Sequence, residues 1–288
     1  MLKFSSQKQH KALVDMVFLA PAVVFFAFFV LVPFLQGVPY AFTNWNIVNP
    51  EYNFIGFRNF IMIFTGRDFF KNFQNTLFYT ILTTIFCNFF GLLFALGVYR
   101  SSRLNNLLRT VFFMPFVISL ILAAYIWRFI YAEIFSPMFQ VITPLASTKW
   151  VIPGISGIAV WRDSGYCMII FIAALQSIPV EFIEASIIDG ANAFQRLRRI
   201  ILPLLVPAFA TNITLLMSWG FKVFEYPMAA TAGGPGGASE TIAMYAYNNI
   251  FAFFKAGLGQ AASITMTVLL AFVTLTISRL IRSREVEM

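Results

Sequence analysis

The sequence predicts an all-α membrane protein with six transmembrane helices. Of its 288 residues, 59% are hydrophobic and 11% are charged, whereas a soluble domain carries about 25% charged residues. The mean hydropathy of +0.79 indicates the same class of protein. Several apolar runs reach the roughly 20 residues that a helix needs to cross a bilayer. We expect spans at residues 14–38, 75–98, 110–130, 158–178, 201–221 and 261–280.

The first of these runs is too long for the apolar part of a cleaved signal peptide, and no small-residue cleavage pattern follows it. We therefore expect this run to remain in the protein as a transmembrane helix.

Basic residues gather at one end of the expected spans. Three precede the first span, three lie between the second and third, three lie between the fourth and fifth, and three follow the sixth. These twelve of the 20 Lys and Arg residues stand in short segments, so the positive-inside rule predicts that both termini are cytoplasmic. They are Lys3, Lys8, Lys11, Arg100, Arg103, Arg109, Arg196, Arg198, Arg199, Arg279, Arg282 and Arg284. Because topology explains these charges, we expect a lipid bilayer and no nucleic acid as a partner.

The connections expected on the outer side differ in kind. Residues 41–72 mix aromatic and polar side chains, as interfacial segments do. Residues 131–157 and 222–260 contain proline and glycine, and none of the three connections is large enough for an independent soluble domain. No G-x-x-x-x-G-K-[ST] pattern occurs, so the Gly-Gly-Pro-Gly-Gly run at 233–237 predicts a flexible outer turn and not a phosphate loop.

The residue patterns of catalytic and metal sites are missing, so we expect neither kind of site. His10 is the only histidine and lies in the polar N-terminal tail, which disfavours Ser–His catalysis. No H-E-x-x-H motif offers a zinc site. Asp163 and Asp189 are too far apart along the chain for a paired aspartyl site. Cys87 and Cys167 lie in apolar runs and suggest neither a disulfide framework nor a metal site.

The connection between the fourth and fifth spans, residues 179–203, is polar and charged. Pro179 can start a helix because its missing N–H would be unpaired there anyway, and Glu181 favours the positive end of the helix dipole. Gly190 is expected to end this helix with a positive φ, and a second short helix is expected at 191–199. A structural linker or a membrane-surface helix would explain the segment. So would a docking element that enters a groove on a cytoplasmic partner.

Polar and aromatic side chains interrupt the fourth and fifth spans. A charged group at membrane depth costs about 2.5–3.5 kcal/mol on insertion scales, so such groups usually face a cavity and pair. Adjacent helical residues do not face each other, so we expect Arg162 to pair with a residue on another helix. Two interpretations stay open: interfacial anchors at the outer ends of the spans, or a path for a solute such as a sugar. The candidate path residues are Trp161, Arg162, Asp163, Tyr166, Asn212 and Trp219.

Several motifs resemble one transporter family. The run Glu184-Ala185-Ser186, with Gly190 after three more residues, Ile200 after nine and then Leu202-Pro203, is similar in spacing to the EAA loop of bacterial ABC importer permeases. Ser186 stands where alanine is usual, and Leu197 where an aromatic residue is common. The resemblance covers nearly the whole chain and points to the carbohydrate branch, of the maltose or multiple-sugar type. Its other motifs are FIGFRNF at 54–60, NTL at 75–77, Pro115 within FFMPFVIS, LQSIP at 175–179 and GGP at 233–235.

The resemblance implies a type I ABC importer transmembrane domain with a cytoplasmic coupling helix. Residues 1–71 would hold the N-terminal tail, the first transmembrane helix and an outer connection. Residues 72–281 would form the transmembrane domain, with the coupling loop at about 179–202, and residues 282–288 a cytoplasmic tail. The ATPase-coupling residues would be Glu184, Ala185, Ser186, Asp189 and Gly190.

The resemblance also implies partners and a function. The chain would be a multi-pass protein of the bacterial cell membrane. It would pair with a second homologous permease, two ATP-binding cassette subunits and an extracytoplasmic sugar-binding protein. No cofactor is expected in this chain, since ATP and Mg would be held by the ATPase partner. The expected function is to form half of the pore of an ATP-driven importer for multiple-sugar, raffinose-like or maltose-like oligosaccharides. The alternative is a secondary transporter for a small polar solute, although no clear repeat relates the two halves of the chain.

Overall fold

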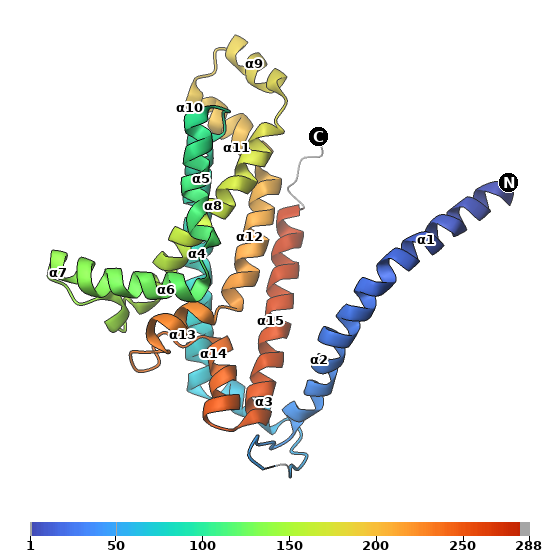
Figure 1. Ribbon diagram of the computed structural model, residues 1–288, viewed down its shortest axis with the longest axis vertical. Helices are drawn as coiled ribbons and strands as arrows, with labels where there is room; N and C mark the ends of the chain where they lie inside the picture. The colour runs from blue at the N-terminus through green and yellow to red at the C-terminus, as the bar shows by residue number, and fades with distance from the viewer. Residues whose placement is uncertain (1, 50, 283–288) are drawn as a thin grey trace. The chain divides into compact units, whose positions relative to one another are not determined.

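The described part of the chain is almost entirely helical (Figure 1). The computed structural model describes residues 2–49 and 51–282, with side chains described between residues 14 and 279 except at residues 50 and 278. Within that part there is no strand, and one isolated antiparallel bridge joins Thr43 to Phe54. The all-α fold class is confirmed. Most of the tail expected at 282–288, including Arg284, lies outside the described residues, as do the side chains of Lys3, Lys8, Lys11 and Arg282.

Five helices among the described residues are long and apolar enough to cross a membrane, and a sixth joins them if one bent helix pair counts as a single span. The five are Val14–Phe42, Arg67–Val98, Leu120–Phe139, Val151–Gln176 and Ala256–Ile277, and the bent pair is Ala193–Leu204 with Val206–Phe221.

The chain divides into two compact units, and the first consists of Met1–Thr65 and Ala246–Ile264. It begins with a long helix in which the window of highest hydropathy buries no residue within the chain. Its elements are α1 (Leu2–Phe26), η1 (Ala27–Leu31), α2 (Val32–Gly37), η2 (Val38–Phe42), α3 (Arg58–Thr65), η6 (Asn248–Ala252) and the start of α15 (Ala256–Arg282).

The second unit, Gly66–Tyr245 with Thr265–Met288, holds the helices on which the candidate site is built. They are α4 (Arg67–Val98), α5 (Arg103–Val117), α6 (Leu120–Phe129), η3 (Ile130–Phe135), α7 (Ser136–Phe139), η4 (Pro144–Ala146), α8 (Val151–Gln176), α9 (Val180–Ile188), α10 (Ala193–Arg196), η5 (Leu197–Ile201), α11 (Leu202–Leu204), α12 (Val206–Phe221) and α13 (Glu225–Thr231), with α14 (Ile242–Tyr247) at its edge.

The third expected span is broken in two. Ile118 and Ser119 are extended, with ψ of 136° and 148°, between the end of α5 and the start of α6. The Ser119 hydroxyl accepts a hydrogen bond from the Leu122 N–H at 3.3 Å and so caps α6. In Figure 1, α6 turns away from the line of α5. The expectation of one continuous span at 110–130 is therefore wrong, because a serine within an apolar run starts a new helix.

The fifth expected span bends by 62° at Leu205. Pro203 and Pro207 flank the bend, and a proline removes a helical hydrogen bond and crowds the preceding turn. The helix before the bend starts at Ala193 and continues to Leu204, so it runs further than the short helix expected at 191–199.

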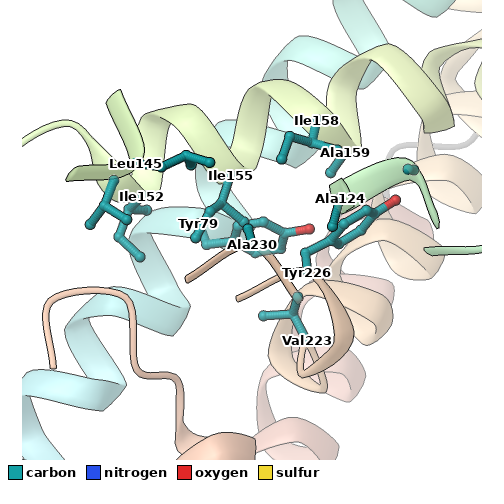
Figure 2. Close-up of a cluster of buried hydrophobic side chains, with 12 residues drawn as sticks. Tyr79, Ala124, Leu145, Ile152, Ile155, Ile158, Ala159, Val223, Tyr226 and Ala230 are labelled. Atoms are coloured by element: carbon teal, nitrogen blue, oxygen red, sulfur yellow. The ribbon is translucent and has the colours of Figure 1, made fainter. Parts of the chain in front are cut away.

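Helix α8 contributes to both hydrophobic clusters of the second unit. One half of α8 packs Ile155 and its neighbours against α4, α6 and α13, where Tyr79 and Tyr226 lie among aliphatic side chains (Figure 2). The other half packs Phe171 and its neighbours against α4 and α12. Cys87 and Cys167 are buried in this second cluster as free thiols.

Close helix contacts in this unit depend on glycine. A Cβ built on Gly165 of α8 would overlap the carbonyl oxygen of Phe112 in α5, and one on Gly220 of α12 would overlap the side chain of Thr80 in α4. Small residues permit such close approach between membrane helices.

We expect Gly165→Ala to lower the midpoint of thermal unfolding of the detergent-purified chain, because α5 backbone would have to move to admit the methyl group. Overpacking of this kind costs about 1–3 kcal/mol. Gly97→Ala in α4 is the matched control, since a Cβ there meets no atom within 4 Å. Alanine is also the better helix former, so the control should melt at or above the parent temperature. Equal melting midpoints for Gly165→Ala and Gly97→Ala would contradict the close contact between Gly165 and α5.

The glycine-rich run at 233–237 is held against α4. The Lys71 Nζ on α4 donates to the Gly236 carbonyl at 3.1 Å, and just after the run the Asn75 side-chain amide donates to the Glu240 carbonyl at 2.9 Å. The run forms a turn, as expected, and these long-range bonds connect it to α4.

Candidate functional site

A cavity of about 460 Å³ lies in the second unit. It is formed where α4, α8 and α12 pass the break between α5 and α6 and the start of α13. Its lining combines aromatic rings with two basic and two acidic side chains: Tyr79, Thr83, Phe116, Leu120, Arg162, Asp163, Leu216, Trp219, Gly220, Lys222, Val223, Glu225 and Tyr226.

Arg162 is held in the cavity wall by three contacts. Its Nη1 donates to Asp163 Oδ1 at 2.6 Å, its Nε donates to the Ile118 carbonyl at 2.8 Å, and its guanidinium lies 4.7 Å from the centre of the Phe116 ring. A buried charge is tolerated when it is paired in this way. The expectation that the ion-pair partner of Arg162 lies on another helix is wrong. The long Arg162 side chain folds back and pairs with Asp163, the next residue of α8. The Ile118 carbonyl is the contact outside α8, and it is available because α5 has ended there.

An aromatic group borders the charged pair. The Tyr166 ring lies 4.8 Å from Phe116 and 5.3 Å from Trp219. Arg162, Asp163 and Trp219 line the cavity itself, and Tyr166 supports its aromatic wall. Rings beside charged and hydroxyl groups are the kind of surface that binds a polar solute with apolar faces.

Two of the predicted path residues lie elsewhere. Trp161 packs in the first hydrophobic cluster, where its ring meets Trp127 of α6 at 5.7 Å. Asn212 of α12 is 1% exposed, and its side-chain amide has no hydrogen-bond partner among the described residues. Neither residue lines the cavity.

Several lining residues had no signal in the sequence. Phe116 is one of 36 phenylalanines, and Tyr79 lies on α4, where no candidate was expected. Tyr226 is 4% exposed and lies near Arg162, and its hydroxyl makes no hydrogen bond of regular geometry among the described residues. Burial raises the pKa of Tyr226 well above its ordinary value, so this hydroxyl stays protonated beside Arg162.

The loop at 179–203 begins with helix α9, which projects from one end of this unit (Figure 1). Pro179 precedes the helix, as expected, and Gly190 has a φ of +76°. The Ala191 N–H donates to the Ser186 carbonyl at 2.9 Å and the Gly190 N–H to the Ile187 carbonyl at 3.0 Å. These two bonds form the glycine-dependent Schellman ending of a helix.

Behind this bend, α10 starts with a capping box. The Gln195 N–H donates to Asn192 Oδ1 at 2.9 Å, and the Asn192 N–H donates to Gln195 Oε1 at 2.8 Å. Both helix ends that meet at Gly190 are therefore satisfied by local bonds, which makes the bend a defined elbow.

The elbow presents most of the predicted coupling residues at the surface. Glu184, Ala185, Asp189 and Gly190 are exposed, whereas Ser186 is buried and donates to the Ile183 carbonyl at 2.6 Å. Exposed apolar side chains surround them, including Ile188 at 86% exposure. A groove of about 490 Å³ runs along α9, lined by Pro179, Glu181, Phe182, Ala185, Ser186, Asp189 and Ile200.

Comparisons with known proteins identify relatives of this chain. Residues 87–285 match the family described as "Binding-protein-dependent transport system inner membrane component". The chain is 33% identical over 281 residues to the probable starch degradation products transport system permease protein AmyD of Thermoanaerobacterium thermosulfurigenes, covering 94% of each chain. It is 28% identical over 244 residues to the trehalose/maltose transport system permease protein MalF of Thermococcus litoralis, covering 82% of each.

A solved structure shares the fold. One chain of a bacterial ABC transporter involved in the import of the acidic polysaccharide alginate superposes with a TM-score of 0.81, at 23% identity, over 98% of this chain and 99% of that one. This chain therefore belongs to the family of inner-membrane components of binding-protein-dependent transport systems.

Proposed function

We propose that this chain is a permease subunit of an ATP-driven importer of uncharged oligosaccharides. The observation that carries the proposal is the 33% identity, over 94% of both chains, to a permease named for the transport of starch degradation products. The chain forms half of a translocation pore, and a second, homologous permease supplies the other half.

The cavity between α4, α8 and α12 is the part of the path that this chain contributes. Trp219 and Phe116 offer ring faces to the C–H side of a sugar, and the Arg162 guanidinium offers donors to its hydroxyl groups. The lining holds two basic and two acidic side chains, so it has no excess charge to attract an anionic sugar. An uncharged solute fits this balance.

The elbow at Gly190 is the part of the chain that contacts the ATPase and couples its ATP hydrolysis to transport. A short helix with exposed apolar and acidic side chains suits a groove on another protein, and Glu184, Ala185, Asp189 and Gly190 are the residues that would meet it. Two cytoplasmic ATPase subunits carry ATP and Mg. An extracytoplasmic binding protein delivers the sugar, and both termini of this chain lie in the cytoplasm.

Reconstitution tests the proposal. Proteoliposomes that hold this chain with its paired permease, ATPase and binding protein should take up a labelled maltodextrin only when ATP and the binding protein are both present. Omitting the ATPase should abolish uptake. Collapse of proton and sodium gradients should leave uptake unchanged.

A secondary transporter is the rival function. It would take up solute with this chain alone, without ATP and in proportion to an ion gradient. That result would overturn the proposal.

A further inference from the structure

The first unit contains a second polar cavity, of about 330 Å³. It lies among the residues that follow η2, the first turn of α3 and the segment that leads into α15. Its lining is Thr43, Asn44, Trp45, Asn46, Ile55, Arg58, Asn59, Met62, Phe254, Lys255 and Leu258.

The walls of this cavity are held by hydrogen bonds. Asn59 is buried, and its amide donates to the carbonyls of Ala41 and Thr43, at 2.8 Å each. The Gly257 N–H donates to the Trp45 carbonyl at 3.0 Å. These bonds connect the backbone segments that carry the lining side chains.

The charged side chains that line the cavity are all basic. Arg58 and Lys255 line it, and no Asp or Glu does. Neither cation makes an ion pair with any residue whose side chain the structure describes. Arg58 opens α3 and Lys255 immediately precedes α15, so the positive ends of two helix dipoles add to the same potential.

The backbone next to Lys255 is strained. Phe254 has a φ of +56°, a conformation that a bulky residue rarely adopts. Such strain persists where the surroundings hold the backbone. Lys255, the next residue, lines the cavity, as Arg58 does.

The surroundings have the composition of a membrane interface. Trp45 packs against Tyr40 at 4.5 Å, and Tyr40 meets Tyr52 at 5.5 Å. Large apolar side chains on and next to α3 are exposed, among them Phe57 at 68% and Phe64 at 69%. Aromatic belts of this kind lie at the level of lipid headgroups. A soluble anion has no apolar part to bind these exposed side chains, whereas the acyl chains of a lipid would cover them.

We propose that this cavity binds the headgroup phosphate of one anionic phospholipid through Arg58 and Lys255, with the acyl chains against the exposed side of α3. Basic pockets on the cytoplasmic side of membranes recognise acidic lipid headgroups in this way, and the same attraction acts on an anionic headgroup of the outer leaflet. The site shares no lining residue with the cavity of the second unit or with the groove along α9.

The test is lipid binding to the full-length chain, purified in mild detergent with the subunits that accompany it. Phosphatidylglycerol and phosphatidylcholine are titrated, and bound lipids are counted by native mass spectrometry. We expect one phosphatidylglycerol to bind in preference to phosphatidylcholine. In the double variant Arg58→Gln, Lys255→Gln its affinity should fall about 25-fold, at about fivefold for each charge near the surface.

The matched control is Arg128→Gln, Lys149→Gln, which removes the same charge from two exposed residues outside the cavity. This variant should bind phosphatidylglycerol as the parent does. An equal loss in both double variants would mean diffuse attraction and would overturn the site.

Two further outcomes would reassign the cavity. Displacement of the bound lipid by millimolar inorganic phosphate would mean that it holds a soluble anion. Unchanged lipid binding in Arg58→Gln, Lys255→Gln together with weaker binding of the extracytoplasmic protein would mean that the two cations meet an acidic protein surface. Either result would overturn the assignment to lipid.

Discussion

Replacing Gly190 with valine is expected to lower ATP-dependent uptake about tenfold while the chain still inserts in the membrane. The Gly190 φ of +76° lies in the left-handed region, which costs a residue with a side chain about 1–2 kcal/mol. A penalty of about 1.4 kcal/mol shifts the equilibrium constant between the native elbow and other loop conformations tenfold away from the elbow, so tenfold is the largest fall in uptake that this penalty produces. A Cβ at Gly190 meets no atom within 4 Å, so the loss would come from the backbone and not from a clash.

Two companion variants separate this effect from general damage. Gly190→Asn should recover most of the uptake, because asparagine tolerates the left-handed region. Gly56→Val is the matched control, because Gly56 has a φ of +59° and so carries the same backbone penalty. A Cβ there also meets no atom within 4 Å, and Gly56 is far from the elbow along the chain. It should transport like the parent. If Gly190→Val transports normally in proteoliposomes with its ATPase, the elbow has no coupling role.

Removing the Arg162 side chain is expected to have the second large effect. Arg162→Met leaves the Asp163 carboxylate buried without its ion pair, and breaking a buried pair costs about 3–5 kcal/mol. We expect a marked fall in the melting midpoint of the purified chain and a loss of uptake.

The double variant Arg162→Met, Asp163→Leu tests the cause. It removes both charges, and replacing a buried pair by apolar residues is often neutral, so most of the stability should return. Uptake should stay low, because the guanidinium lines the cavity. A double variant that transports as well as the parent would exclude Arg162 from the solute path. A single variant as stable as the parent would show that the pair is solvated.

Local signals in the sequence were sufficient for the elbow. Pro179 before a helix and Gly190 after it each act through their own backbone, so their roles follow from residue type and spacing. The structure adds the two bonds of the Schellman ending and the capping box, which involve neighbours within a few residues.

The cavity could be predicted only in part. Arg162 and Asp163 stand out in an apolar span because charge there is costly. Which face of α8 turns toward the cavity depends on the packing of other helices, so Trp161 and Tyr166 could not be assigned from spacing. Trp161 packs against α6, while Tyr166 borders the aromatic wall. Tyr79 and Tyr226 enter the lining from elements distant in the chain.

The break between α5 and α6 at Ile118 also could not be predicted from the sequence. Its apolar run reads as one span, and the serine that caps α6 is a weak signal within it. The freed Ile118 carbonyl is bound by Arg162, 44 residues away along the chain, and no local pattern contains that partner.

By itself, the sequence determined the class of protein, most of the apolar segments that can cross a bilayer and the elbow at Gly190. Each of these depends on residue composition or on bonds between near neighbours. Only the tertiary structure decided where the third span breaks, which backbone carbonyl Arg162 binds and which side chains line each cavity. Those features depend on contacts between helices far apart in the chain, whose rotation and closeness are set by packing around residues such as Gly165.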